Sequence, residues 1–376
     1  MKHISGYVMT EKDLGYRRIQ CTGRGAYIIS LPKSWVENIN LERGSEIAFN
    51  IQPNNTLLLT PRKIAEKQAQ NNSVIKLKEY NINIDQKEDI KNALRMTRAL
   101  YTIGADIIHI RFKNQENTQK YKTETKNFVR DTFLGAEIID ETPNEITLQI
   151  FIKHTEFSIE KAVRRMAIVA LSANRNAITT LTDSNPSLSE SVIQTRNEVN
   201  RLGLYIIRQL KHGIEHNLHR ELGLQTPKEF LLYRIAVNDI ENIAENALNI
   251  INNITAFQKL LDTQTLFIKE PIDEEVYGPL TNYYAQAQQL YEDAVKAMFK
   301  RDYKDAEKLV SKRETFVNLE KDLMMLIASK KLDPNVSAIL RLIFDNAKRI
   351  MDYARNLSEL TLNLTVEELC ATLTFK

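Results

Sequence analysis

Residues 236–250, AVNDIENIAENALNI, have the apolar pattern of a helix with one buried face. The apolar residues of this stretch and the turn after it recur at spacings of three and four: Val237, Ile240, Ala244, Ala247 and Ile251. Such a stripe is stable only where other helices cover it. The stretch therefore predicts a helix inside an all-helical domain.

The same helical period continues from residue 158 to near the end of the chain. We predict helices at roughly 158–182, 187–219, 227–254, 272–299, 303–330 and 334–363. Residues that favour a helix start stand at three of the breaks: Ser187 with Glu190, Thr226 and Pro227 with Glu229, and Asp333 with Pro334. The first three and last three helices form halves of similar length, 157–255 and 270–365, which favours a duplicated three-helix unit.

Residues 73–155 alternate between strand-like and helix-like segments. The predicted strands are 74–77, 105–110, 136–139 and 146–152, and the predicted helices are 87–101 and 118–132. A turn at Thr142, Pro143 and Asn144 would join the last two strands as a hairpin. This order favours a small α/β domain, a linker or a sensor, whose sheet packs on helices. No residue in it indicates a particular ligand.

Residues 1–65 form a separate region of short strands. We predict strands at 17–21, 26–31, 46–52 and 56–60, a helical turn at 33–38 and a hairpin turn at 53–55. Residues 1–70 hold ten Lys and Arg against six Asp and Glu, whereas the whole chain carries only +3. This imbalance points to a polyanion at one end of the molecule. Because about 45 residues bury little surface alone, we expect the region to pair with a second copy.

The composition limits the class of protein. At 376 residues, 43% apolar and 26% charged, the chain is an ordinary soluble protein of more than one domain. No apolar run is long enough to span a membrane, and the first residues lack the apolar core of a secretory signal, so a cytoplasmic location is expected. Cys21 and Cys370 lie near opposite ends, which argues against a disulfide scaffold or a cysteine zinc finger.

The N-terminal region carries the most specific pattern in the chain. Residues 17–36 read RRIQCTGRGAYIISLPKSWV and are followed by LERG at 41–44. This stretch resembles the AbrB/SpoVT swapped-hairpin family, over about 45 residues. The resemblance implies that two chains exchange hairpins to build one β unit, whose basic residues face double-stranded DNA. The matching residues are Arg17, Arg18, Arg24 and Lys33, and arginines on a rigid strand pair suit phosphates well.

Two interpretations of the N-terminal region stay open. Arg17, Arg18 and Arg24 can equally be solvated surface charges on a domain that only dimerises. Tyr27 and Trp35 are better explained as core anchors of the paired domain than as base-stacking platforms.

The helical region resembles PhoU, a family that restrains phosphate uptake and associates with phosphate ABC transporters. The resemblance rests on residues 196–202, 236–250 and 292–303 and spans about 200 residues. Chains that join both modules, with an α/β insert between them, resemble the archaeal PhoU-type regulators. The fold expected is therefore multidomain α+β: a swapped-hairpin β domain, a small α/β domain and two three-helix bundles.

Many PhoU proteins bind metal through two acids four residues apart, which share a helix face. The first copy here is Glu241 with Glu245. At the second copy Lys348 precedes Asp352, and a lysine repels a cation. A divalent ion at Glu241, Glu245 and Asp352 is therefore one interpretation, and a solvated acidic face is the other.

A second metal pattern and the catalytic motifs are less informative. His212, His216 and His219 share a helix face, but Gly213 and the nearby helix end argue against a rigid site. The chain lacks the GxSxG, HExxH and glycine-rich nucleotide motifs, so an enzyme is not expected.

These patterns favour a homodimer, or a higher even oligomer, that binds promoter DNA and regulates phosphate uptake. The alternative is an accessory protein that contacts the ATPase subunit of a phosphate transporter and uses its N-terminal domain only to dimerise.

Overall fold

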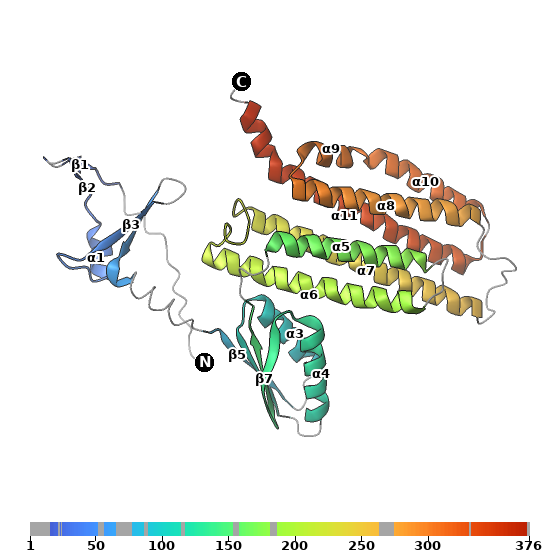
Figure 1. The fold of residues 1–376 in the computed structure, drawn as a ribbon, viewed down its shortest axis with the longest axis horizontal. Coiled ribbons are helices and arrows are strands. Elements are labelled where there is room, and N and C mark those ends of the chain that lie inside the picture. The colour runs from blue at the N-terminus through green and yellow to red at the C-terminus, as the bar shows by residue number, and fades with distance from the viewer. Residues whose placement is uncertain are drawn as a thin grey trace. The chain divides into compact units, whose positions relative to one another are not determined.

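The computed structural model describes residues 16–21, 23, 25–51, 56–64, 77–85, 89–113, 117–152, 158–180, 186–262, 274–330 and 332–373 (Figure 1). The chain divides into two compact units, residues 1–76 and 77–376. Arg24, the turn at 53–55 and the first three residues of the strand expected at 74–77 lie outside the described residues.

The N-terminal unit consists of two short ribbons and a helix. Strands β1 (Gln20–Cys21) and β2 (Tyr27–Ile28) pair antiparallel, as do β3 (Ile47–Ile51) and β4 (Leu57–Pro61). Helix α1 (Lys33–Asn38) lies between the ribbons in sequence. Gly44 has a φ of +90°, which allows the tight turn that leads into β3.

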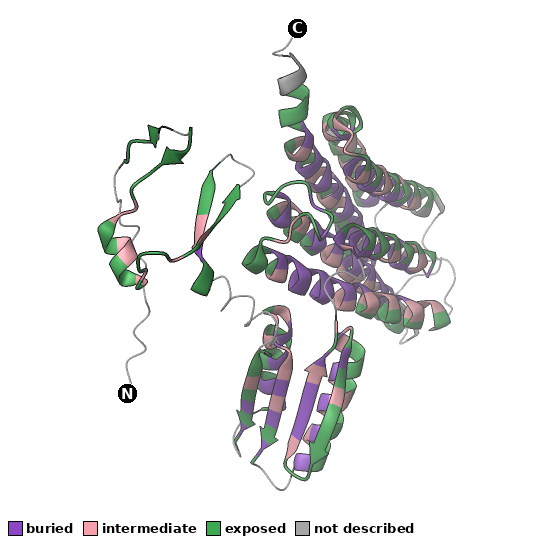
Figure 2. Cartoon of the chain, turned by 60° about the vertical axis from the view of Figure 1, so that its left-hand side comes forward, coloured by how far each residue is buried: buried purple, intermediate pink, exposed green. Residues whose placement is uncertain are grey.

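This unit has no core of its own in a single chain. Among its described residues only Pro61 is buried, and most of the strand residues are exposed and green in Figure 2. Tyr27 is 78% exposed, and Trp35 is only partly buried. Isolated two-stranded ribbons are marginally stable in water. The unit therefore has the apolar side chains of a core but lacks the second layer that would cover them.

The second unit begins with a four-stranded sheet covered by two helices. Its elements are β5 (Glu79–Ile84), α3 (Ile90–Thr102), β6 (Ile107–Phe112), α4 (Thr118–Thr132), β7 (Ala136–Thr142) and β8 (Glu145–Ile150). The strand order is β5-β6-β8-β7, with β5 parallel to β6 and the other pairs antiparallel. Alternate residues such as Ile108 and Ile110 point into the core.

The first described strand of this sheet, β5, was not predicted from the sequence. It runs over residues 79–84, and Leu77, the only described residue of the strand expected at 74–77, precedes it. Tyr80, Ile82 and Ile84 alternate with polar residues, as in a strand with one buried face. Asn81 and Asn83 between them have low strand propensity, so this strand was not predicted.

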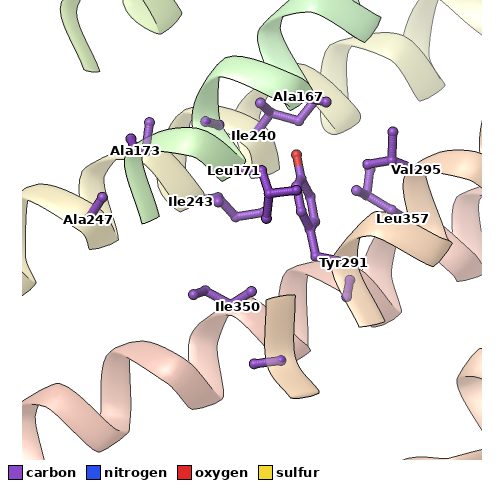
Figure 3. Close-up of a cluster of buried hydrophobic side chains, with 14 of the residues drawn as sticks. Ala167, Leu171, Ala173, Ile240, Ile243, Ala247, Tyr291, Val295, Ile350 and Leu357 are labelled. Carbon is purple, nitrogen blue, oxygen red and sulfur yellow. The ribbon is translucent and has the colours of Figure 1, made fainter. Parts of the chain in front are cut away.

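The rest of the second unit is a bundle of long helices (Figure 1). They are α5 (Ile159–Thr179), α6 (Pro186–His216), α7 (Glu229–Asp262), α8 (Glu274–Lys300), α9 (Tyr303–Ser311), α10 (Arg313–Ser329) and α11 (Pro334–Leu373). The predicted stripe of α7 is buried, and Ile240 and Ile243 face Tyr291 of α8 and Ile350 of α11 across one shared core (Figure 3).

The helix boundaries confirm some start signals and correct others. Asp333 caps α11 by accepting a 2.8 Å hydrogen bond from the Asn335 amide. Glu229 accepts from the amide of Thr226 at 3.1 Å, as a capping box requires, although α7 starts only at Glu229. Ser187 lies inside α6 rather than before its first turn. The helix expected at 303–330 is two helices, α9 and α10, with a break at Lys312.

Candidate nucleic-acid interface and the helical domain

Three of the four predicted DNA-contacting residues lie on the surface of the N-terminal unit. Arg17 and Arg18 are exposed just before β1. Lys33 opens α1, and its side chain is 88% exposed, 3.6 Å from Glu37. An exposed ion pair of this kind is weak, so the lysine can exchange its partner for a phosphate. Arg43, exposed in the turn before β3, is a further cation that the sequence patterns did not single out.

Apolar side chains crowd the same small unit. Eight of the described ones are at least half exposed: Tyr16, Ile19, Tyr27, Ile28, Phe49, Ile51, Leu57 and Leu58. So many exposed apolar side chains on a small unit mark a contact with another protein surface. The unit thus combines exposed cations with a face that needs a partner.

The acids of the predicted metal site on α7 have cationic neighbours. Glu245 pairs with Arg196 at 2.8 Å. Glu241 lies within the electrostatic reach of Arg234, Arg98 and Arg196, and burial raises the pKa of its carboxyl. The Oε1 of Glu241 is buried without a hydrogen bond among the described residues. These arginines oppose the binding of a cation.

Asp352, the third predicted ligand, is on α11 beside an ion pair between Lys348 and Glu320, whose Nζ and Oε1 are 2.7 Å apart. It lines a small cavity of about 150 Å³ together with Tyr283 and Arg355. In the part of the chain that the structure describes, no three His, Cys, Asp or Glu side chains gather around one point. The donor set does not fit a metal ion, so the metal prediction stays without structural support.

The histidines near the end of α6 have other contacts. The rings of His212 and His216 lie 4.2 Å apart, and Nδ1 of His216 is 2.9 Å from the carbonyl oxygen of His212. Glu215 between them forms an ion pair with Lys78 at 2.8 Å.

A buried arginine joins the helical bundle to the α/β layer. Arg208 of α6 is 1% exposed, and its Nη1 donates to the carbonyl oxygens of Tyr101 and Ala105, each at 2.8 Å. Its Nη2 lies 3.5 Å from Oδ1 of Asp106. Burial lowers the pKa of Arg208, whereas Tyr101 and Asp106 act to raise it. The three contacts fix α6 against the end of α3.

Further contacts of α6 strengthen this junction. Leu204 belongs to the core of the sheet layer, and Nη2 of Arg201 donates to the carbonyl oxygen of Phe133 at 3.4 Å. Arg208 was not predicted from the sequence, although its neighbours carry one signal. Residues 202–210 are mostly apolar and buried throughout, and a helix that is apolar on all sides is enclosed by protein.

The bundle core contains one buried carboxyl. Asp239 of α7 is 5% exposed, and burial raises its pKa to about 6, while a hydrogen bond with Asn356 of α11 acts to lower it. Its Oδ2 has no hydrogen bond among the described atoms. The nearby Tyr291 hydroxyl is also buried, and burial together with Asp239 raises its pKa.

Part of the helical bundle matches a known domain family. Residues 163–254, which cover most of α5, all of α6 and most of α7, match the family described as PhoU domain. Residues 22–67 match the family described as antidote-toxin recognition MazE, bacterial antitoxin. The match confirms the predicted resemblance of the N-terminal unit to a MazE/AbrB-like domain. The expected multidomain α+β fold is also confirmed.

Two solved PhoU structures resemble part of the chain. One is the crystal structure of PhoU from Pseudomonas aeruginosa, which is 18% identical in sequence. The match covers 55% of this chain and 94% of that chain, with a TM-score of 0.46. Another is the phosphate transport system regulatory protein PhoU from Streptococcus pneumoniae, with 15% identity, coverage of 55% and 92%, and a TM-score of 0.43. No curated protein matches the chain. In the described part of the chain, no helix is long and apolar enough to cross a membrane.

Proposed function

We propose that this protein is a DNA-binding transcriptional regulator of phosphate homeostasis whose PhoU domain receives or docks the signal. The observation that carries the proposal is the joint exposure of cations and apolar side chains on one small unit, which matches a MazE/AbrB-like domain.

Pairing of two N-terminal units accounts for the missing core. The apolar faces of β3 and β4 would become buried, at about 25 cal/mol for each Å² removed from water. Residues such as Phe49 and Ile51, 62% and 79% exposed in one chain, are the largest contributors. The pair is a homodimer, or part of a higher even oligomer.

Pairing also doubles the cations. Arg17, Arg18 and Lys33 of each copy would lie on one two-fold surface, and the resemblance assigns Arg24 the same role. Each lysine or arginine that neutralises a DNA phosphate releases a counterion, so affinity falls steeply as salt rises. Such contacts position the protein on promoter DNA with modest base readout.

The second unit would carry the signal. The PhoU domain supports a role in phosphate homeostasis. The α/β layer contacts this domain through Arg208, and we propose that it acts as a linker or sensor. The role is regulatory, without catalysis.

A salt titration of binding to a promoter-sized duplex tests the DNA contact. We expect affinity to fall steeply with salt, and the slope of log K against log salt to shrink by about two for Lys33→Ala, one phosphate for each copy. Lys308→Ala, whose side chain is 72% exposed on α9, is the matched control and should leave the slope unchanged.

The competing function is an accessory protein of a phosphate ABC transporter, which contacts the ATPase subunit and uses the N-terminal unit only for pairing. This alternative requires only that the exposed apolar side chains of the N-terminal unit pair with a second copy. Absence of duplex binding at low salt by a chain that is dimeric in solution would establish it in place of the regulator.

A further inference from the structure

An apolar groove lies between the end of α6 and the start of α7. Its volume is about 470 Å³, and its walls include Ile214, Phe230 and Leu231. Ile214 and Leu231 are 58% and 66% exposed, so the groove presents large apolar side chains to solvent. Exposed apolar side chains gathered in one groove indicate a binding surface.

The charged residues of this groove are all basic. Lys211 and Arg234 line it with His219, and its lining contains no carboxylate among the described residues. Arg234 also attracts the carboxylate of Glu241 electrostatically, and that carboxyl is largely buried. Carboxylates nearby are engaged elsewhere: Glu215 with Lys78, and Glu229 with Arg301. The groove therefore fits an apolar helix that carries acids.

The chain itself presents such a helix at the end of α11. This helix has 40 residues, about 60 Å, whereas α8 has 27. Both overall views show its last turns extending past the neighbouring helices (Figures 1 and 2). Thr365 is buried, and residues 366–370 are all exposed.

The exposed turns of α11 have the matching chemistry. Val366 and Leu369, 37% and 38% exposed, are three residues apart and share one helix face. Glu367 and Glu368 lie between them. Glu367 pairs with Lys228 of its own chain at 2.7 Å, but both side chains are about three-quarters exposed, so this pair is weak.

We propose that the end of α11 from a second copy of this chain docks in the groove between α6 and α7. Val366 and Leu369 would cover Ile214 and Leu231, and the two glutamates would face Lys211 and Arg234. This is helix-in-groove recognition. The occupant in this proposal is another copy, and each copy gives one helix end and receives one.

The contact does not depend on DNA binding. If the N-terminal units also pair, the second contact forms at a high effective concentration and needs little affinity of its own.

Cys370, exposed on the projecting turns, provides a test in the full chain. In a Cys21→Ser background, Ile214→Cys places a thiol in the groove. Mild oxidation should then link this introduced thiol of one copy to Cys370 of the other, which gives a covalent dimer on a non-reducing gel. Met325→Cys, 71% exposed on α10, is the matched control and should give at least about tenfold less dimer.

Charge reversal tests the recognition itself. Lys211→Glu should slow the cross-link several-fold, and adding Glu368→Lys should restore the rate, because the ion pair is re-formed with its signs exchanged. Equal dimer yields for Ile214→Cys and Met325→Cys would overturn the proposal, and so would a link that forms only within one chain. The side chains of Lys211 and Glu368 are exposed, so the charge-reversal variants should fold, and circular dichroism checks this.

Discussion

The guanidinium carbon of Arg208 lies 5.4 Å from the centre of the Tyr101 ring while Nη1 of the same arginine donates to the Tyr101 carbonyl oxygen at 2.8 Å. The ring of Tyr101 stacks on Phe133 at 4.5 Å, and its hydroxyl donates to the carbonyl oxygen of Leu134. One arginine of the helical bundle thus reaches the end of α3 and, through Tyr101, the end of α4. Direct contacts therefore join the α/β layer to α6.

Loss of Arg208 should destabilise the whole second unit. Arg208→Met keeps much of the volume but leaves the carbonyl oxygens of Tyr101 and Ala105 without a donor in a buried place. We expect a loss of about 3 kcal/mol in the free energy of unfolding, measured by urea denaturation. Arg208→Lys keeps the charge but loses the planar guanidinium fork, so its loss of stability should lie between those of the natural chain and Arg208→Met. Arg130→Ala, 75% exposed on α4, is the control, and an equal effect of both would contradict the role of Arg208.

Two helical glycines should respond differently to alanine. A Cβ on Gly213 would collide with the ring of Phe230 and with Leu222, so Gly213→Ala should cost about 1–3 kcal/mol. A Cβ on Gly278 of α8 meets nothing within 4 Å outside its chain neighbours, and the helix propensity of alanine is opposed by the following Pro279, so Gly278→Ala should change the stability by less than about 0.5 kcal/mol. Thermal unfolding of the two variants compares them, and equal losses of stability would refute the close packing at Gly213.

The buried Asp239 should make stability fall as pH rises. Its folded pKa is about 6, above the ordinary value of 3.8, so between these values the folded state holds a proton that the unfolded state has lost. Stability from this group is complete below about pH 4 and is lost as pH rises through 6. At about 1.4 kcal/mol for each pKa unit, the loss is up to about 3 kcal/mol.

Asp239→Asn removes the titration, so the variant should be more stable than the natural chain above about pH 7 and nearly equal to it at about pH 4. Urea unfolding at both pH values measures this. Asp322→Asn, an exposed acid on α10, should not change the pH dependence. A pH profile that is identical for Asp239→Asn and the natural chain would show that Asp239 is not the titrating group.

The pairing of N-terminal units should protect β3 and β4 from hydrogen exchange. In one chain these strands form an isolated ribbon whose apolar side chains are exposed, so protection requires a partner. Phe49→Glu should abolish protection at 47–51 and 57–61 and leave α5 unchanged, because a charge cannot enter the paired core. Met325→Glu, at an exposed position on α10, is the control and should leave the protection of both strands unchanged. Fast exchange of both strands in the natural chain would rule out the pairing.

Part of this architecture could be predicted from local pattern alone. Helix α4 has the predicted bounds, and the hairpin of β7 and β8 closes at Thr142 as the turn residues indicated. Local period and turn chemistry act over a few residues, so they are readable in the chain. The break between α9 and α10 was not readable, because a continuous helical period runs across Lys312.

The sequence by itself determined the order of the modules, the helical period of the bundle and the basic character of the N-terminal unit. Only the tertiary structure decided that arginines surround Glu241 and pair with Glu245, that Arg208 is buried at a junction, and that a basic apolar groove lies beside α7. The physical reason is that spacing along a helix fixes which side chains share its face. What that face meets is fixed by residues more than a hundred positions away, as Arg208 and Tyr101 are.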